Sequence, residues 1–171
     1  KQVVEAYTDL TGVPELPPLW ALGFHQSKWS YYPESRVKEV ASTFRKLKIP
    51  CDAIYLDIDY MEGFRCFTWN NQYFPNPKKM IEELEEDGFK TVTMIDPGIK
   101  IDRDYWVYQQ AMDNGFFCRR ADGPHFKGKV WPGPCKFPDF TNPEVREWWS
   151  GLYKEMVADM GVKGVWNDMN E

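Results

Sequence analysis

At residues 53–59 the chain reads Ala53-Ile54-Tyr55-Leu56-Asp57-Ile58-Asp59, a run that is apolar until its carboxyl end. Such a run predicts a strand that is buried on both faces. We expect a helix to follow from Pro77 to Glu86, with Gly88 in a C-cap position. The next apolar run, Thr91 to Asp96, predicts a second strand that stops before Pro97-Gly98. This order of strand, helix and strand is typical of a βαβ unit with parallel strands.

The same rhythm extends in both directions along the chain. Before this unit, Leu19–His25 predicts another buried strand, and a helix that begins at Pro33 and Glu34 is expected to end before Pro50. After it, we expect a helix at 104–113, an irregular stretch at 121–138, a helix from Asn142 to about Met160, and a last strand at 162–168. These four βα units indicate an α/β fold. A doubly wound sheet fits them, and so does half of a (β/α)8 barrel, since a whole barrel takes about 250 residues.

The chain is expected to divide into two unequal parts. Residues 1–18 predict a lead-in helix, Val3–Leu10, and a Pro-rich connector, and residues 19–171 predict the α/β unit. Because the chain starts at Lys1 and stops at Glu171, just after a strand-like run, we expect both ends to lie inside a longer polypeptide.

Composition excludes some classes of protein. The 21 Lys and Arg residues against 26 Asp and Glu residues give a net charge of −5, which argues against a nucleic-acid-binding protein. No apolar run approaches the roughly 20 residues that span a bilayer. The four cysteines, Cys51, Cys66, Cys118 and Cys135, lack metal-site spacing and are too few for a disulfide scaffold. We therefore expect free thiols, which favour a cytoplasmic location.

Carboxylates stand at the ends of three of the four expected strands: Asp57 and Asp59, Asp96, and Asp168. In parallel α/β folds the ligand site lies at the carboxyl ends of the strands. The chain is also 16% aromatic, with eight Trp residues, and such an excess belongs in a core, an interface or a ligand site. Carboxylates bind hydroxyls, aromatic faces stack on sugar rings, and paired carboxylates cleave glycosidic bonds. The pattern therefore favours a site for a polar, uncharged ligand such as a sugar.

Other interpretations of the same residues stay open. An Asp at a strand end is often the cap of the next helix, and Asp57-x-Asp59 could hold a divalent metal in a transferase. His25 could be a catalytic base or a hydrogen-bonded core residue. Trp148 and Trp149 on the last helix are expected to serve packing.

Six stretches then resemble one known family in order along the chain. The segment Trp166-Asn167-Asp168-Met169-Asn170-Glu171 resembles the signature of glycoside hydrolase family 31 that follows the fourth barrel strand and carries the nucleophile. The other five similar stretches are Leu22–Trp29, Leu56–Met61, Met94–Pro97, Gly128–Gly133 and Phe137–Pro143. The resemblance covers nearly the whole chain and implies the first four βα units of a (β/α)8 TIM barrel.

The resemblance also implies roles for individual residues. Asp168 would be the nucleophile of a retaining α-glycosidase, an α-glucosidase rather than an α-xylosidase, with no metal and no organic cofactor. Asp57 would bind sugar hydroxyls. The residues implied to line the subsite are Trp29, Met94, Trp131, Trp166 and Met169, and the supporting residues are Asp59, Asp96 and Glu171.

One departure from the family pattern concerns the second carboxyl group that a retaining enzyme needs as general acid/base. The family places it, together with an Arg and a His of the sugar site, in the second half of the barrel, and it places a β-sandwich domain before the barrel. The resemblance therefore implies that residues 1–171 alone are inactive on α-linked oligosaccharides. Within the same family the alternatives are an α-xylosidase, an α-glucosyltransferase and a glucan lyase. Outside it they are the metal-dependent transferase that uses Asp57 and Asp59, and a sugar-binding relic without catalysis.

Overall fold

A computed structural model describes residues 1–169. Its centre is a sheet of four parallel strands in the order β1-β2-β3-β7, formed by His25–Gln26, Ala53–Leu56, Lys90–Ile95 and Gly164–Asn167. Consecutive strands in the chain order are neighbours in this sheet, as βα units predict. Glu171 and its neighbour Asn170 lie outside the described residues.

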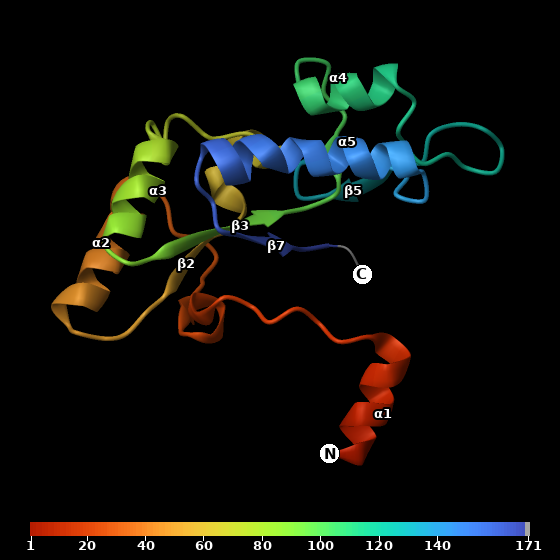
Figure 1. Cartoon of the computed structure of the whole chain (residues 1–171). Coiled ribbons are helices and arrows are strands. Elements are labelled where there is room, and N and C mark those ends of the chain that lie inside the picture. Colours follow the sequence, from red (N-terminus) through yellow and green to blue (C-terminus); the bar gives the residue numbers. More distant parts are fainter. Residues whose placement is uncertain (170–171) are drawn as a thin grey trace.

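Three helices connect the four strands: α2 (Glu34–Lys46), α3 (Pro77–Glu86) and α5 (Pro143–Lys154), which continues as a π-helical turn, Glu155–Asp159. In Figure 1, α2 and α3 lie side by side next to β2, and α5 runs along β3 and β7. Asn142 caps α5, because its side-chain oxygen accepts the backbone N–H of Glu144 at 2.9 Å. The predicted helices therefore form, with ends within a few residues of the expected ones.

The connection between β3 and α5 contains a smaller layer. The helix α4 (Trp106–Asp113) is accompanied by an antiparallel sheet in the order β4-β6-β5, formed by Ile99–Lys100, Gly133–Lys136 and Gly128–Val130. The prediction of an irregular stretch at 121–138 is therefore wrong in part. These strands are short and rich in Gly and Pro, so they carry no hydrophobic period that would predict them.

The predicted strand at Leu19–His25 is also wrong over most of its length. Leu19–Leu22 forms a 3₁₀ turn, in which Ala21 N–H donates to the Pro18 carbonyl at 2.9 Å, and only His25–Gln26 joins the sheet. A short apolar run without periodicity does not distinguish a strand from a helical turn.

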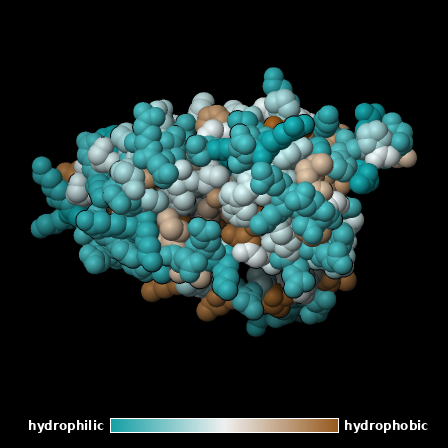
Figure 2. Space-filling model, turned by 90° about the horizontal axis from the view of Figure 1, so that it is seen from above, coloured by the Kyte–Doolittle hydropathy of each residue, from teal (hydrophilic) through white to brown (hydrophobic). Residues whose placement is uncertain are grey.

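The main hydrophobic core fills the space between the parallel sheet and its helices, and a second cluster lies between α4 and α5. The first helix, α1 (Gln2–Thr11), buries none of its residues and projects away from the rest of the chain in Figure 1. On the face seen in Figure 2, hydrophilic residues predominate and hydrophobic residues gather along one edge. None of the helices within residues 1–169 has the length and apolar character that would let it cross a bilayer.

Candidate active site

A cavity of about 180 Å³ lies at the carboxyl ends of the parallel strands. Its lining consists of Trp29, Asp57, Ile58, Met94, Trp131, Trp166 and Asp168. The register of the sheet explains this convergence, because Leu56 pairs with Thr93, which brings Asp57 level with Met94, and Met94 pairs with Trp166. Six of the residues that the sequence predicts for the site therefore meet at one place.

Asp57 follows β2 directly and lines this cavity. It also caps the turn that comes next. Its Oδ1 accepts the backbone N–H of Ile58 at 2.7 Å, at the start of a 3₁₀ turn, Ile58–Tyr60. Partial burial raises the pKa of Asp57, and the negative charges of Asp59 and Asp168 add to this increase. Asp57 therefore caps the turn, and it also lines the cavity.

Asp168 follows β7 directly. Its backbone N–H donates to the carbonyl of Ile95 at 3.1 Å, which extends the β3–β7 ladder to the edge of the cavity. This bond holds the Asp168 backbone beside the end of β3, where Asp96 begins the next turn. Asp168 is half-buried and belongs to the lining of the cavity.

Asp96 follows β3 directly and is not among the residues that line the cavity. It is 2% exposed, and its Oδ1 accepts the backbone N–H of Gly98 at 2.7 Å, while its Oδ2 has no hydrogen-bond partner within the described residues. Burial raises the pKa of Asp96, and the charge of Asp168 adds to this increase. The charge of Asp168 therefore acts on both Asp57 and Asp96.

Two of the three tryptophans in the cavity wall are more than half exposed: Trp29 at 68% and Trp131 at 52%. Their ring centroids are 6.2 Å apart, with the ring planes tilted by 42°. Asp59 does not line the cavity, and its Oδ2 accepts the indole N–H of Trp29 at 3.0 Å. Asp57 therefore lines the cavity, whereas Asp59 bonds to a tryptophan of the cavity wall.

Sequence reasoning missed Ile58 in the wall and Tyr60 behind it. The Tyr60 hydroxyl, almost fully buried, donates to the carbonyl of Met94 at 2.8 Å and so ties the end of β2 to β3. An aromatic residue directly after Asp57-Ile58-Asp59 was the available signal, because a buried Tyr normally finds a hydrogen-bond partner.

The family model for the glycosyl hydrolases family 31 TIM-barrel domain matches residues 14–171. The chain belongs to this family. The four parallel strands are accordingly part of a (β/α)8 barrel, about its first four βα units, and the doubly wound alternative no longer applies.

Similar family 31 proteins are known in sequence and in structure. Alpha-glucosidase 2 from Bacillus thermoamyloliquefaciens is 50% identical over the whole chain, which covers 22% of that protein. The crystal structure of a family 31 alpha-glucosidase from Bacteroides thetaiotaomicron is 50% identical, with a TM-score of 0.91 over 99% of this chain and 29% of that one. A family 31 dextranase from Flavobacterium johnsoniae, complexed with glucose, is 39% identical with a TM-score of 0.85 over 98% of this chain and 21% of that one. The chain therefore spans less than a third of each of these relatives.

Besides Asp59 and Asp96, two further predicted site residues are not found in the lining of this cavity. Met169 is not among the lining residues, is 37% exposed and has a positive φ of 58°. Glu171 lies outside the described residues.

The structure also bears on the alternative interpretations of His25, of Trp149 and of a metal site. Both ring nitrogens of His25 have partners, the Tyr55 hydroxyl at 3.0 Å and the Trp20 carbonyl at 3.1 Å, as expected for a structural histidine. Trp149 packs on Phe67 and Tyr153, in agreement with its predicted packing role. Across residues 1–169, no three His, Cys, Asp or Glu side chains form a group that could hold a metal ion.

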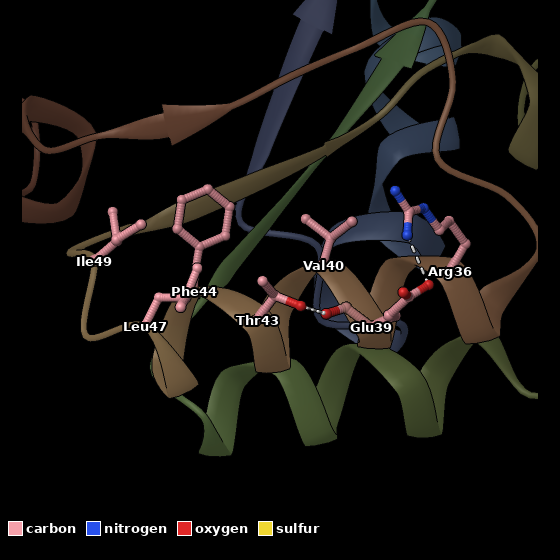
Figure 3. Close-up of a pocket in the computed structure, with 7 residues that line it drawn as sticks. All are labelled: Arg36, Glu39, Val40, Thr43, Phe44, Leu47 and Ile49. Atoms are coloured by element: carbon pink, nitrogen blue, oxygen red, sulfur yellow. Dashed lines mark hydrogen bonds and ion pairs between the residues drawn. The ribbon is translucent and has the colours of Figure 1, made fainter.

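A larger hollow, about 300 Å³, lies beside α2 on the side of this helix that faces away from α3, as Figure 3 shows. Its wall is mainly apolar, from Val40 to Ile49, with the ion pair of Arg36 and Glu39 at one end, 2.7 Å apart. Leu47 and Ile49 belong to the turn that enters β2 at its amino end, so this hollow is separate from the carboxylates at the opposite end of the strands.

Proposed function

We propose that the chain is the N-terminal half of the catalytic barrel of a retaining α-glucosidase that removes terminal α-linked glucose from oligosaccharides. Residues 19–171 form this half in the proposal, and residues 1–18 are its lead-in helix and connector. The observation that carries the proposal is the cavity in which Asp57 and Asp168 lie together with three tryptophans.

In this mechanism Asp168 attacks the anomeric carbon of the bound glucosyl unit. The glycosidic C–O bond breaks, the leaving oxygen takes a proton from the acid/base residue, and a covalent glucosyl-enzyme forms on the Asp168 carboxylate. Water then gives a proton to the acid/base carboxylate and attacks the same carbon. The bond from this carbon to Asp168 breaks, and α-glucose is released. The acid/base carboxyl group, about 5–5.5 Å from the nucleophile, comes from the second half of the barrel in the longer polypeptide.

The remaining cavity residues bind and orient the sugar. Asp57, whose position at the rim leaves a carboxylate oxygen for the ligand, accepts hydrogen bonds from ring hydroxyls. Trp29, Trp131 and Trp166 contact the apolar faces of the sugar, and Met94 closes the bottom of the subsite. Asp59 and Asp96 act through these residues, and Met169 and Glu171 remain predicted members of the site.

The test uses the longer protein with an aryl α-glucoside. We expect hydrolysis with retention, so that NMR detects the α-anomer of glucose first. Asp168→Asn is expected to lower kcat by roughly three orders of magnitude or more, because a nucleophile is lost. Asp113→Asn, at the exposed end of α4, is the matched control and keeps full activity.

The alternative activities give different results in the same assay. Faster turnover of an α-xyloside would indicate an α-xylosidase, transfer to a sugar acceptor would indicate a glucosyltransferase, and an unsaturated product would indicate a lyase. Binding without turnover would indicate a sugar-binding relic. A requirement for Mn²⁺ or Mg²⁺ that depends on Asp57 and Asp59 would favour the metal-dependent transferase instead.

A further inference from the structure

Trp29 has a position that its own packing does not explain. It lies in the loop between β1 and α2, and 68% of it is exposed. Its ring meets the ring of Trp131 at 6.2 Å, and Trp131 is itself 52% exposed. Yet Trp29 lines the cavity, so something must hold its indole at the mouth rather than leaving it free to rotate into solvent.

The directional contact of this side chain is the hydrogen bond from its indole N–H to Oδ2 of Asp59, at 3.0 Å. The acceptor is a carboxylate, and hydrogen bonds to ionised acceptors are stronger than neutral ones. The bond connects the loop after β1 to the 3₁₀ turn after β2, between residues that are 30 positions apart in the chain.

Asp59 is well suited to act as an anchor because its own turn is held on both sides. Asp57 caps the turn at Ile58, and Tyr60 is buried and bonded to the Met94 carbonyl at 2.8 Å. Asp59 lies between these two fixed neighbours. The Asp59 carboxylate is therefore presented from the rigid end of the sheet, whereas Trp29 comes from a loop.

We propose that Asp59 is a positioning residue, which holds the Trp29 indole across the mouth of the cavity. In this position Trp29 and Trp131 together contact the sugar ring. The inference rests on the proposed function and gives Asp57 and Asp59 different roles. Asp57 contacts the sugar, and Asp59 acts through Trp29. The two tilted rings act on the bound sugar in the ground state and in the transition state alike, so their loss weakens binding and leaves the chemical step nearly unchanged.

The kinetic test compares Asp59→Asn, Trp29→Phe and the double variant in the longer protein. Each single variant is expected to raise KM roughly fivefold and to change kcat by less than about twofold. The double variant is expected to resemble the single variants, because both substitutions remove the same bond. Additive effects in the double variant would overturn the proposal.

Trp29→Phe also separates positioning from charge. The Asp59 carboxylate raises the pKa of Asp57, so Asp59→Asn alters both the tether and the charge near the sugar. Trp29→Phe removes the donor and part of the aromatic ring, and it keeps the Asp59 charge. If Asp59→Asn raises KM and Trp29→Phe does not, Asp59 acts on Asp57 directly and the tether is not its role.

Trp148 offers a matched control for the loss of an indole hydrogen bond. The indole N–H of Trp148 in α5 donates to Oε1 of Gln110 in α4, also at 3.0 Å, and neither residue lines the cavity. Trp148→Phe removes an equivalent bond and is expected to leave KM and kcat unchanged.

A readout without turnover distinguishes failure of this inference from failure of the proposed function. With 5-fluorotryptophan incorporated, the ¹⁹F resonance of Trp29, assigned by its loss in Trp29→Phe, is expected to shift in Asp59→Asn and on addition of a glucose-like iminosugar. An unshifted resonance in Asp59→Asn would overturn the tether whatever the activity. A protein with the shift but without α-glucoside turnover would keep the tether and refute the proposed function.

Discussion

Asp96 is buried more deeply than the other carboxylates at the strand ends, at 2% exposed. One of its oxygens accepts the Gly98 N–H and the other has no partner within the described residues. Burial of an ionised carboxylate is unfavourable, which is why the pKa of Asp96 is raised. A group whose pKa is higher in the folded state destabilises the fold once the pH rises above its unfolded value.

Asp96→Asn is therefore expected to keep or raise the melting temperature at pH 7, because it removes the charge and retains an oxygen for Gly98. The gain should disappear on acidification below the ordinary Asp pKa of 3.8. Asp96→Ala loses the bond to Gly98 and is expected to destabilise by about 1–3 kcal/mol. Calorimetric melting curves of the longer protein check this, and an Asp96→Asn variant as unstable as Asp96→Ala at pH 7 would show that a cation pairs with this carboxylate.

Six residues of the cavity wall could be predicted from the sequence, but the different contacts of the neighbouring carboxylates could not. Strand ends and sequence order predicted that Asp57 and Asp168 belong together. No pattern distinguishes Asp57, which lines the cavity, from Asp59, which bonds a tryptophan 30 residues away. That difference depends on the 3₁₀ turn after β2, which a strand prediction for residues 53–59 does not contain.

At the scale of elements, the hairpin β5–β6 carries Trp131 to the cavity, and a buried lysine supports it. Lys136 on β6 is 6% exposed, and its Nζ lies 2.8 Å from Nδ1 of His125 and over the ring of Tyr108 in α4. Since an ammonium group only donates, Nδ1 must accept, which requires a neutral His125.

Acid should therefore weaken this hairpin. Burial lowers the pKa of His125 from its ordinary 6.5, and the charges of Lys136, Arg119 and Lys127 add to this decrease. A histidine with a lowered pKa in the fold contributes stability that is present at higher pH and is lost as the pH falls below 6.5. His125→Asn retains an acceptor near Nδ1 but does not titrate, so its melting temperature should fall less between pH 7.5 and 5 than that of the unaltered protein. Identical pH dependence of the two proteins would contradict this account.

Long periodic elements were predictable here, and short ones were not. The helices at 34–46 and 77–86 and the strand at 90–95 have clear apolar patterns and appear as expected. Leu19–Leu22 is apolar, but it makes local turn bonds after Pro18, and the three-residue strand Gly128–Val130 pairs through its backbone with almost no side-chain signal.

At the scale of the whole molecule, residues 1–169 form an arc of a barrel. Within these residues β1 and β7 are the edges of the sheet. In the hollow beside α2, Leu47 is 60% exposed and Ile49 is 45% exposed. Open edges of parallel sheets and apolar grooves favour association. We expect the isolated 171-residue chain to self-associate in light scattering and to show no α-glucoside turnover. A monodisperse monomer that unfolds cooperatively, or turnover comparable to that of the longer protein, would contradict these expectations.

The most direct measurement of the central claim uses the longer protein, incubated with a 5-fluoro-glucosyl fluoride, digested and mapped by mass spectrometry. This reagent traps a glucosyl-enzyme because its deglycosylation is slow. We expect a 5-fluoroglucosyl adduct on the peptide that contains Asp168, without added metal, and no adduct in Asp168→Asn. An adduct on any other carboxylate, in a protein that hydrolyses α-glucosides, would contradict the assignment of Asp168 as the nucleophile.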